Sequence, residues 1–73
     1  MNKRTGVIAV YFEERAFGFV NENQNGRLFK LFLHVSNILS GTPRTGATVL
    51  FNEGSNQKGA MAIDVEVLDG GAL

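Results

Sequence analysis

Short apolar segments separated by turn residues are the feature that most constrains how this chain can fold. The segments are rich in β-branched and aromatic residues, and none carries the 3.6-residue apolar stripe of an amphipathic helix. We predict five strands, at residues 5–12, 16–21, 28–35, 47–53 and 60–68. We predict turns or loops at 23–26, 41–46 and 54–59, and one helical or 3₁₀ turn at 36–39 capped by Ser36. Because closure into a barrel removes exposed sheet edges, this pattern predicts a small all-β barrel.

The length of the chain, 73 residues, is enough for one small domain, and we predict a single domain over residues 1–73. We expect residues 5–68 to be ordered and residues 69–73 to form a tail. Cysteine is absent from the sequence, so disulfides and thiolate metal sites are excluded. No apolar run is long enough to span a membrane, and the opening MNKRTG lacks the apolar stretch of a signal peptide. We therefore expect a cytoplasmic protein without a membrane partner.

The charge balance limits the kind of nucleic-acid binding that the chain can support. Seven basic residues offset seven acidic ones, so the formal net charge is zero. A domain that holds duplex DNA mainly through its phosphates is usually strongly basic. If the partner is a nucleic acid, something other than bulk positive charge must supply much of the affinity.

Side-chain alternation gives two of the predicted strands faces of different character. One face is small or aliphatic, with Ala16, Gly18, Val20, Leu31, Leu33 and Val35; the other mixes aromatic and polar groups, with Arg15, Phe17, Phe19, Asn21, Phe32 and His34. The aliphatic set has no polar atom and is cheaper to bury, so we predict that the aromatic set faces outward. Asn25-Gly26 favours a hairpin, which would join the two aromatic faces into one patch that Tyr11 can extend. The predicted core is Val20, Leu31, Leu33, Ile38, Val49, Phe51, Val65 and Val67.

Three interpretations of this patch are open. Phe17 and Phe19 can be core residues with Gly18 outside, or they can be exposed and form a protein interface. The third interpretation is a site for single-stranded nucleic acid, where rings stack on bases for about 1–3 kcal/mol per base. The mixture of rings with Arg, Lys and His side chains favours this third interpretation, because the cations can contact phosphates and His can both stack and donate a hydrogen bond.

Two motifs resemble those of the cold-shock domain family. Arg15–Val20 reads RAFGFV, where the family has K-G-F-G-F-I/V, and Leu31–Ile38 reads LFLHVSNI, where it has V-F-V-H-F/Y-S-x-I. The likeness continues at Tyr11-Phe12 and at residues 57–62, and it spans about residues 6–67. The chain departs from the family pattern where Tyr11 replaces Trp, Val10 replaces Lys, Val35 replaces an aromatic residue and Ala16 replaces Gly. The loop at 39–45 is also short and lacks the family's aromatic residue.

The resemblance implies a five-stranded antiparallel OB-fold barrel that binds single-stranded RNA or DNA in the cytoplasm, as an RNA chaperone or a regulator of transcription or translation. By matching position it implies nucleic-acid contacts at Tyr11, Phe12, Phe17, Phe19, Phe32, His34 and Lys58, with Arg15 in place of the motif's lysine. Lys30 stands where the family often has Asp and adds a positive charge near the patch. We include Lys30 among the predicted binding residues, and we expect no cofactor.

Catalysis has little support in the sequence. His34 is the only histidine, so one chain cannot assemble a histidine metal site, and Ser36 two residues later is more simply a capping serine. Asp64 and Glu66 share a strand face, but a solvated outer face explains them. We therefore predict that the chain is not an enzyme. The alternative function is a protein-interaction or self-association module that uses the same patch, and we expect a monomer or weak homodimer.

Overall fold

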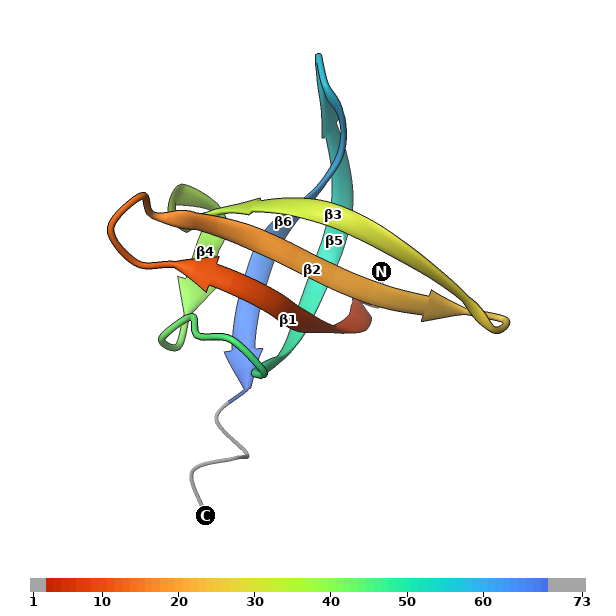
Figure 1. Ribbon diagram of the computed structural model, residues 1–73, viewed down its shortest axis with the longest axis horizontal. Helices are drawn as coiled ribbons and strands as arrows, with labels where there is room; N and C mark the ends of the chain where they lie inside the picture. Colours follow the sequence, from red (N-terminus) through yellow and green to blue (C-terminus); the bar gives the residue numbers. More distant parts are fainter. Residues whose placement is uncertain (1–2, 69–73) are drawn as a thin grey trace.

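The computed structural model describes residues 3–68, which form a β-barrel (Figure 1). Its strands are β1 (Arg4–Phe12), β2 (Phe17–Gln24), β3 (Arg27–His34), β4 (Ile38–Ser40), β5 (Thr48–Asn56) and β6 (Gly59–Leu68), with a 3₁₀ turn, η1, at Val35–Asn37. The predicted tail at 69–73 lies outside the described residues. Within those residues no helix has the length and hydropathy needed to cross a membrane.

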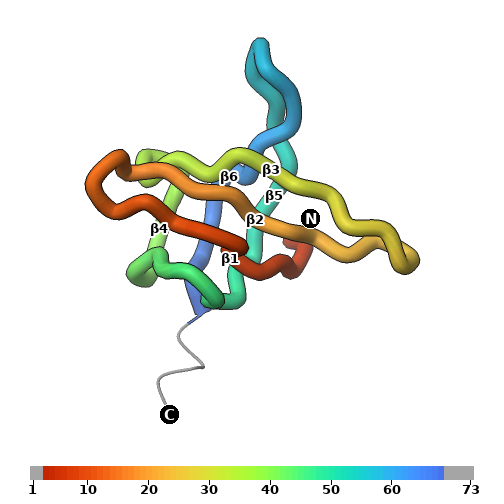
Figure 2. The backbone as a smooth tube through the Cα atoms, in the orientation of Figure 1, coloured from red at the N-terminus to blue at the C-terminus, as the bar shows by residue number. Residues whose placement is uncertain are grey.

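The strand order closes the sheet on itself. Neighbours run β3-β2-β1-β5-β6-β4, and the long neighbouring strands pair antiparallel. A parallel bridge between Phe32 of the edge strand β3 and Met61 of β6 closes the barrel. Figure 2 traces the curved backbone of these strands. The five long strands confirm the predicted all-β OB-fold barrel. The three-residue β4, which pairs parallel to β6, was not predicted.

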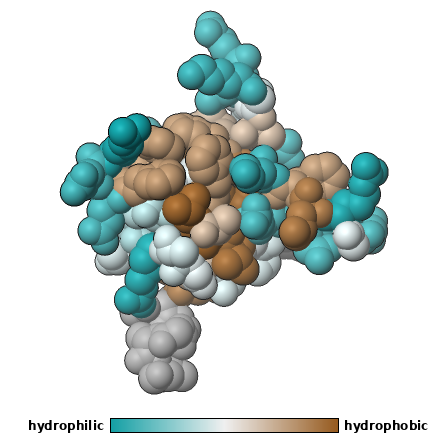
Figure 3. Space-filling model, viewed as in Figure 1, coloured by the Kyte–Doolittle hydropathy of each residue, from teal (hydrophilic) through white to brown (hydrophobic). Residues whose placement is uncertain are grey.

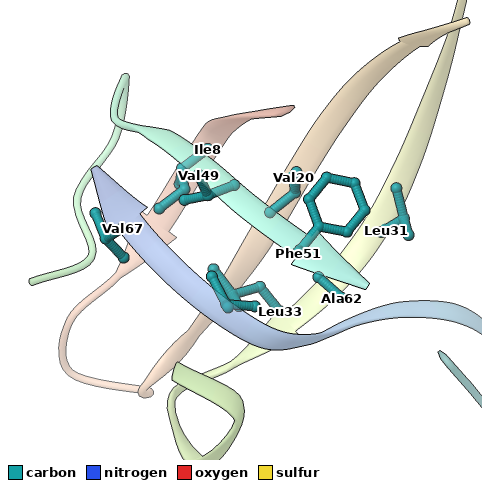
Figure 4. Close-up of a cluster of buried hydrophobic side chains, with 9 residues drawn as sticks. Ile8, Val20, Leu31, Leu33, Val49, Phe51, Ala62 and Val67 are labelled. Atoms are coloured by element: carbon teal, nitrogen blue, oxygen red, sulfur yellow. The ribbon is translucent and has the colours of Figure 1, made fainter. Parts of the chain in front are cut away.

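The core lies where the aliphatic strand faces meet (Figure 4). It contains Ile8, Val20, Leu31, Leu33, Val49, Phe51, Ala62, Val65 and Val67, all buried. Every predicted core residue is among them except Ile38, which is half-buried and packs against the cluster. The inward placement of Val35 was wrong: it is 40% exposed, because β3 ends at His34 and the chain turns into η1. The prediction that Ala16 belongs to the inner face of a strand was also wrong. Ala16 lies in the turn before β2, with a positive φ of 63°.

Two hairpins extend beyond the barrel (Figure 1). The β2–β3 hairpin turns at Asn25-Gly26, whose φ angles of 54° and 86° suit a tight two-residue turn, as predicted. The predicted loop at 54–59 was wrong, because β5 and β6 stay paired as far as Asn56 and Gly59. Backbone hydrogen bonds form this second hairpin without an alternating apolar pattern, so the sequence offered no strand signal there. The β5–β6 hairpin consequently projects as an arm, at the top of Figure 1.

An ion-pair network ties three strands together beside the core. Glu22 on β2 is 4% exposed, and it accepts hydrogen bonds from Arg4 Nε at 2.7 Å and from Gln24 Nε2 at 2.8 Å. Arg4 on β1 also reaches Glu53 on β5 at 2.9 Å, and its guanidinium lies 5.6 Å from the centre of the Phe51 ring. The hydrogen bond from Arg4 holds the pKa of the Glu22 carboxyl below its usual value.

Candidate functional site

The outer face of β2 and β3 presents the predicted aromatic patch. Phe17 pairs with His34 and Phe19 pairs with Phe32 across the two strands. All four side chains are half-buried, whereas the alternate residues Gly18, Val20, Leu31 and Leu33 are buried on the opposite face. The patch therefore faces outward, and the interpretation of Phe17 and Phe19 as core residues was wrong. Figure 3 shows apolar side chains gathered over this part of the barrel, with hydrophilic residues around them.

Five rings form one contiguous group, which we call the aromatic cluster: Phe12, Phe17, Phe19, Phe32 and His34. The Phe17 and Phe32 rings stack with centroids 5.7 Å apart, and Phe12 lies 5.3 Å from Phe17. Phe19 meets Phe32 edge-on at 6.0 Å, and His34 lies 6.4 Å from Phe32. These are the separations of favourable aromatic pairs. The rings therefore hold one another in place while their outer surfaces remain accessible.

Tyr11 is not brought into the aromatic cluster. It pairs with Gly18 on the inner side of β2 and packs against the core. An irregularity in β1 between Ile8 and Val10 inserts one extra residue, which reverses the alternation that follows. Phe12 consequently joins the outer face, where it pairs with Phe17 and is 42% exposed. The close approach of β1 to β2 at this point depends on Gly18, because a Cβ there would clash with the Val10 carbonyl oxygen and lie 2.9 Å from Tyr11 Cα.

His34 is held by the turn that follows β3. Its Nδ1 accepts a hydrogen bond from the Ser36 backbone N–H at 3.1 Å and lies 2.9 Å from Ser36 Oγ. The predicted cap at Ser36 was therefore wrong, since the His34 side chain caps η1. With Nδ1 accepting, the neutral ring carries its proton on Nε2, which leaves a donor for a ligand. Within residues 3–68 no acidic group is hydrogen-bonded to His34, so this contact lacks the orienting partner of a catalytic triad.

A groove runs between the aromatic cluster and the tip of the β5–β6 arm. Its lining residues are Phe17, Phe19, Lys30, Phe32, Asn56, Gln57, Lys58, Gly59 and Ala60. Asn56 Oδ1 accepts hydrogen bonds from the backbone N–H of Lys58 at 2.8 Å and of Gly59 at 3.1 Å, which fixes the tip. Apart from Lys58, our sequence reasoning missed this wall as a site, although residues 57–62 form part of the family-like pattern.

The charges of the groove are all positive. Lys30 and Lys58 line it, and no acidic side chain does. The Lys30 ammonium lies 5.5 Å from the centre of the Phe19 ring. Arg15 is exposed in the turn between β1 and β2 and does not line the groove. Lys3 and Arg4, by contrast, form ion pairs with carboxylates on the barrel.

The side chains that line the groove are of kinds that bind rings and anions. Across residues 3–68, no group of three His, Asp or Glu side chains lies close enough to hold a metal ion. The groove combines aromatic surfaces with two ammonium groups. Aromatic surfaces bind flat rings by stacking, and ammonium groups bind anions, so the groove suits a ligand in which flat rings are linked by anionic groups. Nucleotides in a single strand have this composition.

Comparison with known proteins agrees with the geometry. The family model of the 'Cold-shock' DNA-binding domain matches residues 4–68, which span all six strands. No curated protein was found to match the chain.

Proposed function

This chain belongs to the cold-shock domain family, and we propose that it binds single-stranded RNA or DNA by stacking bases on the aromatic cluster. The family is one of nucleic-acid-binding domains, so binding of nucleic acid in general follows from membership. The finer role that we propose is an RNA chaperone or a regulator of transcription or translation in the cytoplasm. The observation that carries the proposal is the outward-facing cluster of five rings beside a positively charged groove.

The ring surfaces supply most of the proposed affinity. Each base that stacks contributes about 1–3 kcal/mol, and stacking tolerates every base because each has a π-face. A single strand presents those faces, whereas a duplex buries them between its own base pairs. Stacking therefore supports binding of single strands by a chain whose net charge is zero.

The two lysines of the groove supply the electrostatic part of the proposed site. Lys30 projects from β3, and Lys58 lies at the tip of the β5–β6 arm, on the other wall. A strand whose bases rest on Phe17 and Phe32 would therefore have ammonium groups on both sides for its phosphates. His34 can add a hydrogen bond from Nε2 at the end of the cluster.

The test measures binding of fluorescently labelled oligo-U and oligo-dT by anisotropy at low salt. Phe17→Ala and Phe32→Ala should each weaken binding about 5- to 150-fold, the loss of one stacked base. Phe29→Ala is the matched control, because Phe29 is 43% exposed on the same strand as Phe32 but does not line the groove. Unchanged binding by Phe17→Ala and Phe32→Ala would contradict base stacking.

The same variants distinguish the alternative function. If the aromatic cluster serves self-association, Phe17→Ala and Phe32→Ala should shift an oligomer toward monomer in size-exclusion chromatography. Their oligonucleotide signal would then stay unchanged. A protein that stays monomeric in every variant while losing oligonucleotide affinity would support the nucleic-acid site.

A further inference from the structure

Lys30 has an unusual position within the proposed site. It projects from the outer face of β3, opposite Asn21 of β2, and its side chain is exposed. Its ammonium lies 5.5 Å from the centre of the Phe19 ring, within the range of a cation–π contact. Among residues 3–68, Lys3 and Arg4 contact carboxylates, whereas the side chain that the Lys30 ammonium contacts is the ring of Phe19.

We propose that Lys30 competes with a nucleobase for the face of Phe19 and leaves that face when a phosphate of the bound strand draws its ammonium away. The inference rests on the proposed function, since it assigns a step to the same groove. Lys30 and Phe19 both line the groove, so the cation occupies ring surface that a strand would approach.

The energies allow this exchange. A cation–π contact at an exposed site corresponds to about a two- to fivefold effect on an equilibrium, whereas one stacked base corresponds to about 5- to 150-fold. The base therefore displaces the ammonium. The flexible four-carbon stem of lysine lets the released charge reach a neighbouring phosphate while its backbone stays in β3. Lys30 thus opposes stacking of a base on Phe19 and also strengthens binding of the phosphate backbone of the nucleic acid.

Lys58 is a matched comparison within the same groove. It carries the same charge on the opposite wall, but among the described residues the lysine that makes a cation–π contact is Lys30. Removing Lys58 should cost a phosphate contact alone. Removing Lys30 should cost a phosphate contact and also uncover a stacking surface.

The experiment titrates labelled oligo-U with the full chain, with Lys30→Gln and with Lys58→Gln, from about 0.05 to about 0.5 M salt. Each substitution should reduce the slope of log K against log[salt] by about 0.7, the value of one contact to a single strand. At every salt concentration Lys30→Gln should bind about two- to fivefold more tightly than Lys58→Gln, because only Lys30→Gln uncovers the ring of Phe19.

A second background tests the role of the ring itself. Phe19→Leu keeps an apolar side chain but removes the π-face, so Lys30→Gln and Lys58→Gln should bind equally in that background. In the free protein, the ring current of Phe19 should shift the NMR signals of the Lys30 ε-methylene upfield of those of Lys58. Oligo-U and Phe19→Leu should each remove this shift.

The outcomes separate this inference from the proposed function. Equal affinities of Lys30→Gln and Lys58→Gln, in a protein that binds oligo-U through Phe32, would overturn the competition alone. A difference that persists in Phe19→Leu would also overturn it, because the ring would then have no part in the effect. No binding of oligo-U by the unmodified protein would overturn the proposed function and the competition together.

Discussion

Phe32 and Leu33 are neighbours on β3 that should have opposite roles, one in binding and the other in stability. Leu33 is fully buried in the core of the barrel. Phe32 is half-buried on the outer face, where its ring contacts Phe17, Phe19 and His34. We expect Leu33→Ala to lower the free energy of unfolding strongly and Phe32→Ala to lower it modestly.

The magnitudes follow from burial. Leu33→Ala removes a fully buried side chain and leaves a cavity, which costs about 2–5 kcal/mol. A domain of this size has about 3–5 kcal/mol of stability to lose, so much of the variant should be unfolded at room temperature. Phe32→Ala loses three aromatic pair contacts and partial burial, and we expect about 1–2 kcal/mol, less than the roughly 3–5 kcal/mol of a fully buried Phe. Ile8→Val is a milder core change, expected to cost about 0.5–1.5 kcal/mol.

The assay is urea unfolding followed by far-UV circular dichroism and by the fluorescence of Tyr11. Tyr11 is the only tyrosine and packs against the core, so its emission reports the folded barrel. With a slope of ~1 kcal/mol per molar urea, Ile8→Val should lower the midpoint by about 0.5–1.5 M. If Phe32→Ala unfolds the protein while Leu33→Ala leaves the midpoint unchanged, the assignment of the two faces is refuted. The site built on it would then be refuted as well.

Two further predictions concern pH and base choice. Arg4 lowers the folded-state pKa of Glu22, so the ionised Glu22 carboxylate should stabilise the protein fully above the usual glutamate pKa. This stabilisation should be lost as the pH falls through the lower folded-state pKa. Urea midpoints should show the loss in the unmodified protein and a flatter pH profile in Glu22→Gln. Asn56 lines the groove and uses its Oδ1 for the turn, so its amide N–H₂ can donate to uracil O4, where cytosine has a donor instead. We therefore expect a preference for oligo-U over oligo-C, and Asn56→Asp, which keeps the acceptor but removes the donor, should lower it about fivefold. Asn23→Asp makes the same change at the cap of the β2–β3 hairpin, outside the groove, and an equal fall there would contradict a role for Asn56.

Local patterns in the sequence were sufficient for the barrel and for one wall of the site. The period of two in β2 and β3 assigned Phe17, Phe19 and Phe32 to one face and Leu31 and Leu33 to the other, as the structure confirms. This succeeded because successive side chains of a regular strand must point to opposite faces. The Asn-Gly turn succeeded for a similar reason, since few residue pairs accept its positive φ angles.

Departures from regular geometry were decided by the tertiary structure. The extra residue in β1 turned Tyr11 toward the core and Phe12 toward the cluster, although both are aromatic and adjacent. A one-residue bulge reverses every later side chain of a strand, and nothing in the composition around Ala9 marks it. The end of β3 at His34 likewise exposed Val35, which a longer strand would have buried.

The second wall of the groove shows the same division between local and tertiary information. Sequence patterns placed a loop at 54–59, because polar residues there carry no strand period. Backbone pairing instead extended β5 and β6 into an arm that brings Lys58 opposite Lys30. Backbone hydrogen bonds are the same for every residue type except proline, so they leave no signature in the side chains. The sequence by itself therefore determined which rings face outward, and only the folded chain decided what lies across from them.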